Sequence, residues 1–209
     1  CGQMNCGACK MNVRVTEMCP TCRATFFVSA EEQFKRLWKL VHDRSPGRHT
    51  PAAQTHLGAM YAVGKGVKQD YTKAVKWYRC AAEQGHAEAQ NRLGNAYRDG
   101  EGVTKDTDEA FKWYRHSAEN GDSHGQVNLG ACYCYGNGVE PDINKANYWW
   151  RLSAEQGYRH AQVNLGFSYI LGEGVTKNPR IAKKWFRLAA QQTHPEAFRI
   201  LKEIQKFEA

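Results

Sequence analysis

The sequence predicts an all-α fold, a right-handed solenoid of helical hairpins made of four 36-residue repeats, with capping helices and a small cysteine-rich N-terminal segment. Between Thr50 and Thr193, a Leu-Gly pair, a tyrosine, a Gly-x-Gly-Val loop and an Ala-x-x-Trp motif each recur four times, 36 residues apart. Within each copy, apolar residues recur at helical spacing on either side of the glycine loop. Two short amphipathic helices cannot bury their aromatic side chains alone, whereas stacked copies can.

Four cysteines near the N-terminus form two close pairs, Cys6-x-x-Cys9 and Cys19-x-x-Cys22. Each pair can form a tight turn whose sulfurs face one ion, as tetrahedral zinc requires. Few apolar residues surround them, so bound metal could supply much of the folding energy. Disulfides are the alternative, but the repeats show no disulfide framework. The sequence therefore predicts a zinc-binding segment at residues 1–28, and reduced zinc thiols favour a cytoplasmic or nuclear location.

The residues on either side of the repeats read as capping elements. Ser29-x-x-Glu32 is a capping box in front of an amphipathic helix, and a capping helix with its linker is expected at 29–49. This helix falls where the second helix of a preceding copy would lie. A C-terminal capping helix is expected at 194–209, where Lys202 occupies the glycine position of a terminal helix with nothing stacked beyond it.

The four repeats are placed at 50–85, 86–121, 122–157 and 158–193. In the first copy, Leu57 and Tyr61 share one face of the first helix, and Gly58 keeps that face thin for a close neighbour. Gly64 is expected to end this helix in the left-handed conformation. Asp70 is placed as the N-cap of the second helix. The corresponding N-cap residues of the later copies are Asp106, Asp142 and Asn178.

One tryptophan recurs in the second helix of every copy, at Trp77, Trp113, Trp149 and Trp185. Exposed tryptophans could stack on bases or sugars. Their fixed period at helical spacing instead favours a buried core.

Residues 53–85 follow the pattern Ala-x-x-x-Leu-Gly-x-x-Tyr-x-x-Gly-x-Gly-Val and then Lys-Ala-x-x-Trp-Tyr-x-x-Ala-Ala-Glu-x-Gly almost literally. This pattern resembles the Sel-like repeats of the tetratricopeptide superfamily, and the resemblance covers about three quarters of the chain. It implies an adaptor that holds other proteins along a curved groove. In this family such arrays serve signalling complexes and, in some members, protein degradation at the endoplasmic reticulum.

The first-helix stripe opposite the packed face changes between copies while the core stays fixed. It is polar in copy two, where it includes Arg98, and apolar in copies three and four. The apolar members chosen as partner-binding residues are Val127, Tyr135, Val163, Phe167, Ile170 and Leu171. We expect the C-terminal half of the groove to bind an apolar peptide or helix of a protein partner. The alternative is that this stripe packs between helices of a tightly coiled array.

The segment from Cys1 to Arg23 resembles the C-terminal half of a RING finger, in Cys1-Gly-Gln-x-x-Cys-x-x-Cys and in Cys-Pro-x-Cys-Arg. Gln3 stands where the family pattern has histidine. The resemblance implies that Cys1, Cys19 and Cys22 share one zinc, while Cys6 and Cys9 share a second with an upstream Cys-x-x-Cys. It also implies that Pro20 and Arg23 contact a ubiquitin-conjugating enzyme. Alternatively, Cys6, Cys9, Cys19 and Cys22 hold one zinc in a ribbon-like site.

Composition and motifs exclude several other classes. The net charge of +8 is spread out, with +4 before residue 50 and +4 after it, and nucleic-acid motifs are missing, so no nucleic-acid partner is expected. No apolar run is long enough to cross a membrane. No nucleophile elbow, phosphate loop or His-Glu-x-x-His motif is present, so no conventional catalytic residue is predicted. Two functions remain, an interaction scaffold and a RING-type ubiquitin ligase whose repeats select the substrate.

Overall fold

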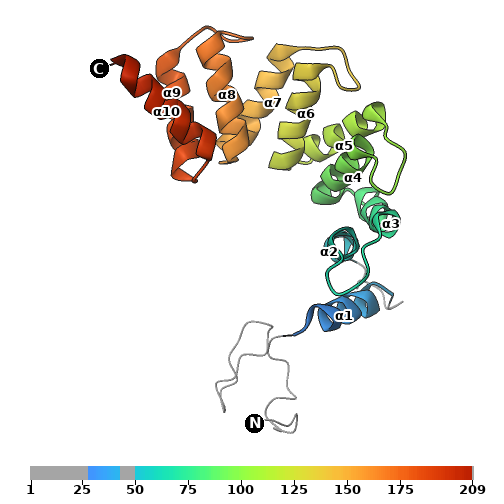
Figure 1. The fold of residues 1–209 in the computed structure, drawn as a ribbon. Helices are drawn as coiled ribbons and strands as arrows, with labels where there is room; N and C mark the ends of the chain where they lie inside the picture. The colour runs from blue at the N-terminus through green and yellow to red at the C-terminus, as the bar shows by residue number, and fades with distance from the viewer. Residues whose placement is uncertain (1–27, 43–49, 209) are drawn as a thin grey trace, which may run out of the picture.

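A computed structural model of the chain describes residues 28–42 and 50–208. In these ranges the protein is all-α, with ten helices and no strand, arranged one after another along a curved array (Figure 1). None of these helices is both long and apolar enough to cross a membrane. The helices are α1 (Ala30–His42), α2 (Pro51–Val63), α3 (Tyr71–Ala82), α4 (Ala87–Asp99), α5 (Thr107–Glu119), α6 (Ser123–Tyr135), α7 (Ile143–Glu155), α8 (Arg159–Leu171), α9 (Pro179–Gln191) and α10 (Pro195–Glu208).

Each of the four copies is one hairpin, formed by α2–α3, α4–α5, α6–α7 and α8–α9, so the predicted helical-hairpin solenoid is confirmed. The first helix of a copy also packs against the second helix of the copy before it. The first helix α4 contacts both α2 and α6, whereas no two second helices are in comparable contact. The first helices therefore line the inner side of the curve, and the second helices form its outer side.

The helix ends follow the predicted capping residues. Gly64 is left-handed with φ of 77°, and its backbone N–H donates to the carbonyl of Met60 at 2.9 Å. The Asp70 carboxylate accepts a hydrogen bond from the backbone N–H of Lys73 at 2.9 Å, which caps α3. The same N-cap role is held by Asp106, Asp142 and Asn178. Capping is therefore repeated in each copy by the same position of the sequence.

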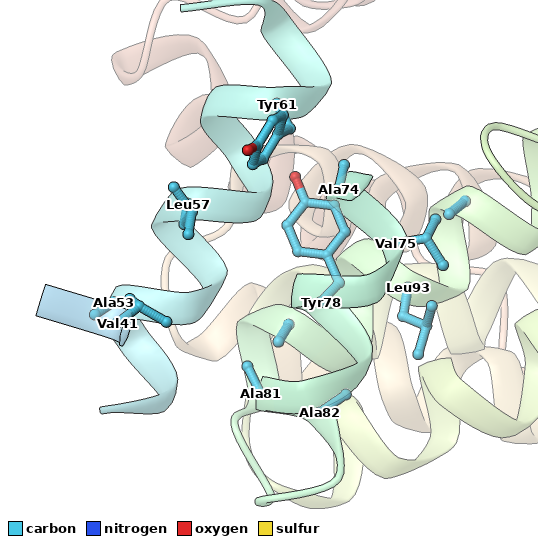
Figure 2. Packing of buried hydrophobic residues seen from close by; sticks show 12 residues of the cluster. Val41, Ala53, Leu57, Tyr61, Ala74, Val75, Tyr78, Ala81, Ala82 and Leu93 are labelled. Carbon is cyan, nitrogen blue, oxygen red and sulfur yellow. The ribbon is translucent and has the colours of Figure 1, made fainter. Parts of the chain in front are cut away.

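An aromatic side chain that follows the repeated tryptophan fills the core of each hairpin. Tyr78 is 5% exposed and lies between α3 and α2, close to Ala74 and Tyr61 (Figure 2). A β-carbon placed on Gly58 would lie only 2.7 Å from the Tyr78 ring, so glycine is needed for this close approach. The corresponding buried aromatic residues are Tyr114, Trp150 and Phe186, which face Gly94, Gly130 and Gly166.

The repeated tryptophans were expected to form the buried core, and the structure corrects this. All four, Trp77, Trp113, Trp149 and Trp185, are partly buried and pack against the margins of the core clusters. Successive residues of a helix point about 100° apart, so only one of two neighbouring aromatic residues can face the thin glycine surface. That residue is the one after the tryptophan in every copy.

The two terminal helices take up equivalent positions in the array. Gly66 lies against the carbonyl of Ala30 at the start of α1, as Gly102 lies against Tyr71 at the start of α3. Helix α1 therefore holds the place of a second helix, and Phe34 and Leu37 pack on the core of the first copy. Helix α10 holds the place of a further first helix. Its exposed Lys202 stands where the four copies have their packed glycine.

Candidate protein-binding groove

The groove-stripe residues form rows along the solenoid, one residue per copy, and these rows differ in exposure. The row that begins with Thr55 faces the core, since Thr55 and Asn91 are buried and Val127 is half-buried. Val163 belongs to this row, is 3% exposed and packs in the core cluster around Phe186. Val163 was chosen from the sequence as a groove residue, but here the packing alternative applies, because the adjoining helices cover this side of α8.

The most exposed row consists of the last residue of each first helix. Val63, Tyr135 and Leu171 are 76%, 73% and 59% exposed, respectively. Each is followed by the left-handed glycine that ends its helix, so the side chain lies at a helix end that no neighbour covers. In copy two the same position is the exposed Asp99. The row is therefore apolar except in the second copy.

Half-buried apolar residues adjoin this row in copy four. The Phe167 ring packs edge-on against Phe186, with ring centroids 5.5 Å apart, and keeps part of its surface exposed. Ile170 is half-buried beside it and packs against the same core cluster. Together with Tyr135 and Leu171 they form what we call the apolar ridge, residues 135, 167, 170 and 171. The ridge thus has apolar side chains from both C-terminal copies.

The second copy interrupts the apolar row with a polar network. The Arg98 guanidinium donates two hydrogen bonds to the Asp99 carboxylate, at 2.8 and 2.7 Å. These bonds hold the pKa of Asp99 below its usual value and raise the pKa of Arg98. Nearby, the Tyr114 hydroxyl donates to Asn95 at 2.7 Å. Arg98 is exposed as expected, but its guanidinium already has a partner within the chain.

A ladder of buried glutamines joins the copies, and sequence analysis missed it. Gln90 is 5% exposed, its amide donates to the Ala82 carbonyl at 3.1 Å, and its oxygen accepts a hydrogen bond from Asn120 at 3.0 Å. Equivalent side chains are Gln54, Gln126 and Gln162, each accepting a hydrogen bond from the residue thirty positions later. The signal was present, since glutamine recurs every 36 residues at a position that faces the core. The ladder is structural, since hydrogen bonds from its glutamines to alanine carbonyls join copies two to four to the copies before them.

The metal and conjugating-enzyme predictions fall on residues that the structure does not describe. These residues are Cys1, Cys6, Cys9, Cys19, Pro20, Cys22 and Arg23. In the described ranges, no group of three or more His, Cys, Asp or Glu side chains could hold a metal ion. Cys80, Cys132 and Cys134 are free thiols, and burial raises the pKa of Cys132 to about 11. Cys132 is buried in the core cluster around Tyr114 and Leu129, where it acts as a packing residue.

Comparison with known proteins agrees with this architecture. The Sel1 repeat model matches residues 51–86, 87–122, 123–158 and 159–194. A Sel1 repeat protein from Oxalobacter formigenes is 36% identical, with a TM-score of 0.77 over 84% of this chain and 70% of that one. A protective antigen of uropathogenic Escherichia coli with an SLR fold is 32% identical, with a TM-score of 0.74.

The lengths of the relatives differ from that of this chain. The alignment with the Escherichia coli antigen covers 86% of this chain but only 42% of the antigen. Cysteine-rich protein B of Helicobacter pylori is 25% identical, with a TM-score of 0.52 over 65% of this chain and 97% of its own. No curated protein matches the sequence. Four matched repeats and the close likeness to solved Sel1 structures show that the chain belongs to the Sel1 repeat family.

Proposed function

We propose that the protein is a scaffold whose apolar ridge in copies three and four binds an apolar segment of a protein partner. Sel1 repeat proteins are in general scaffolds for protein–protein interaction. The observation that carries the proposal is the exposure of Tyr135 and Leu171, at 73% and 59%, in the same position of successive copies. Two large apolar side chains in neighbouring copies of a solenoid form a surface that a partner can cover.

The ridge suits a partner that contributes apolar side chains to both copies. Burying apolar surface is favourable by about 25 cal/mol per Å². Tyrosine brings a hydroxyl that can stay hydrated at the rim, and such residues are enriched at protein interfaces. Copy two ends the ridge with the Arg98–Asp99 pair, so a partner that extends towards copy one meets a polar surface. We expect the partner segment to be an amphipathic helix or a short extended peptide that lies across the C-terminal ends of α6 and α8.

The test is selection of peptides from a random displayed library with the whole chain, followed by affinity measurement with two double variants. Tyr135→Asp with Leu171→Asp is expected to weaken binding of the selected peptides at least about tenfold, because each charge faces apolar side chains of the peptide. The matched control, Tyr148→Asp with Phe198→Asp, changes side chains that are 58% and 48% exposed elsewhere and should change affinity less than about twofold.

A second hollow between α1 and α2 also presents apolar surface from Leu37, Leu40 and Met60, and its lining further includes Val28, Gln33, Arg36 and His56. Peptides that bind there would lose affinity on Leu40→Asp and keep it on the ridge variant. That outcome would refute the proposed site while leaving a scaffold function. Selected peptides that are insensitive to both changes would refute both surfaces.

The cysteine pairs support a second candidate, a RING-type ubiquitin ligase whose repeats choose the substrate. The spacing of Cys6, Cys9, Cys19 and Cys22 supports a zinc site, and the motif Cys-Pro-x-Cys-Arg supports contact with a conjugating enzyme through Arg23. Reduced zinc thiols support a cytoplasmic or nuclear location. Zinc per chain after dialysis tests the module. A value near one favours a ribbon-like site, a value near two requires the upstream Cys-x-x-Cys pair of the RING pattern, and a value near zero removes the module. Autoubiquitination by the full-length protein that Arg23→Ala abolishes would favour the ligase.

A further inference from the structure

The outer side of the fourth copy carries a basic surface that the other copies lack. We propose that this face of α9, formed by Arg180, Lys184, Arg187 and the neighbouring Leu188, binds an acidic segment of a partner protein. The surface belongs to a second helix, and so lies on the opposite side of the array from the apolar ridge. It is a further binding site, independent of the one proposed for the groove.

Comparison of equivalent segments shows how unusual this charge is. The second-helix segments at 68–84, 104–120 and 140–156 have net charges of +2, −1 and −1 from their Lys, Arg, Asp and Glu residues. The fourth, at 176–192, has five basic residues, no acidic residue and a net charge of +5. More than half of the net charge of the whole chain, +8, therefore lies in this one segment.

The basic residues of α9 form one stripe on the solvent side of the helix. Arg180, Lys184 and Arg187 follow at intervals of four and three, so they share a face about 10 Å long. All three are exposed, while Ala182 and Phe186 on the opposite face are fully buried. Leu188 adjoins the stripe at four residues from Lys184 and is 42% exposed.

Several basic residues on the second helices of the other copies have partners within the chain. Lys112, the equivalent of Lys184 in copy two, pairs with Glu109 at 2.6 Å. Lys73 pairs with the N-cap Asp70 at 3.2 Å, and Lys145 pairs with the N-cap Asp142 at 3.3 Å, at a position that is Ile181 in copy four. In copy four the N-cap is Asn178, which carries no charge. The N-cap carboxylate that pairs with a lysine in copies one and three is therefore replaced by an uncharged amide at the start of α9.

The arginine row shows the same difference. Arg79 donates to the hydroxyl of Tyr97 in the next copy at 2.6 Å, and Arg151 donates likewise to Tyr169 at 3.0 Å. Arg187 is the equivalent arginine of copy four. The position of the accepting tyrosine is a glutamine, Gln205, in α10. Among the side chains that the structure describes, which end at Ile204, no carboxylate or tyrosine hydroxyl engages those of Arg180, Lys184 or Arg187. Their donors are available to a partner.

The extent of the basic surface favours a short acidic peptide segment over a larger polyanion. The outer segments of copies two and three, 104–120 and 140–156, are net negative, and α10 alternates basic residues with Glu196 and Glu203. A nucleic-acid duplex or an anionic membrane would contact these acidic neighbours as well as α9. Two or three carboxylates at helical spacing, with one apolar residue against Leu188, match the stripe in length and in chemistry.

The probe for the test is a fluorescein-labelled helical peptide with Glu at positions i, i+4 and i+7 and one leucine, compared with its Gln counterpart by fluorescence anisotropy. The whole chain should bind the Glu peptide at least about tenfold more tightly than the Gln peptide, and less tightly as salt rises. Arg180→Gln with Lys184→Gln and Arg187→Gln should remove this preference. The matched control, Lys65→Gln with Lys68→Gln and Lys76→Gln, loses the same charge from copy one and should retain it.

Three outcomes would overturn the proposal. The first is equal binding of the Glu and Gln peptides. The second is equal loss in both triple variants, which would indicate attraction by net charge alone. The third is tighter binding of duplex DNA or phosphatidylserine vesicles through the same three residues. The ridge variant of Tyr135 and Leu171 should still bind the Glu peptide, so failure of this proposal and failure of the groove proposal are distinguishable. Circular dichroism and thermal melting establish that each variant is folded.

Discussion

Replacing Phe186 by alanine is expected to destabilise the fourth copy strongly, whereas replacing the adjacent repeated tryptophan should cost much less. Phe186 is fully buried, and a β-carbon on Gly166 would lie 2.6 Å from its ring, so the ring fills the space between α8 and α9. Removing a fully buried phenylalanine costs about 3–5 kcal/mol. Its edge-on contact with Phe167 contributes about 0.5–1.5 kcal/mol of that cost, which favours the upper part of the range.

Trp185 provides the matched comparison on the same helix. It is only partly buried, so Trp185→Ala should cost about 1–2 kcal/mol. Urea titrations followed by far-UV circular dichroism measure both changes. In a solenoid, the loss should concentrate in copy four and α10, so an early transition of partial amplitude is expected for Phe186→Ala. An equal or larger loss of stability for Trp185→Ala would refute the assignment of the core aromatic.

Three further predictions concern single positions. Thr193 has φ of 60°, where the other copies have glycine, so Thr193→Gly should raise stability by about 0.5–1 kcal/mol in urea titration; a loss would contradict strain there. Gln90→Leu removes the buried hydrogen bonds to the Ala82 carbonyl and from Asn120 and should cost about 1–3 kcal/mol in the same assay, and no change would refute the ladder's role. Desolvation, with repulsion from His194, lowers the pKa of His160 below 6.5. The unfolded chain then binds this proton more readily, so the melting temperature should fall as pH drops from 7 towards 5.5, and more steeply than in His160→Asn. Equal dependence of the melting temperature on pH in the two proteins would contradict the lowered pKa of His160.

The helix boundaries were predictable because single residues encode them locally. The left-handed Gly64 and the N-cap Asp70 act within one turn of their own positions, and a fixed period repeats them in every copy. The same period made the stacking of hairpins predictable, since neither helix of a pair can bury its aromatic residues alone. Local chemistry and repetition together therefore gave the architecture.

Which side chains are buried depends on contacts between helices, and there the sequence was a weaker guide. Trp77 and Tyr78 recur with the same period, and only the approach of Gly58 in the folded hairpin selects Tyr78 for the core. Val163 and Leu171 lie on neighbouring parts of one helical stripe, yet Val163 is covered by adjoining helices while Leu171 lies at an open helix end. Periodicity identifies an apolar stripe but does not show how much of that stripe the neighbouring helices cover.

Hydrogen exchange measured by mass spectrometry, with and without a peptide selected by the whole chain, tests the apolar ridge most directly. The amides near Tyr135 and Leu171 end α6 and α8 beside exposed side chains, so bound peptide should slow their exchange while α2 is unchanged. Protection confined to α1 and α2, with none at the ends of α6 and α8, would contradict binding by the C-terminal half of the groove.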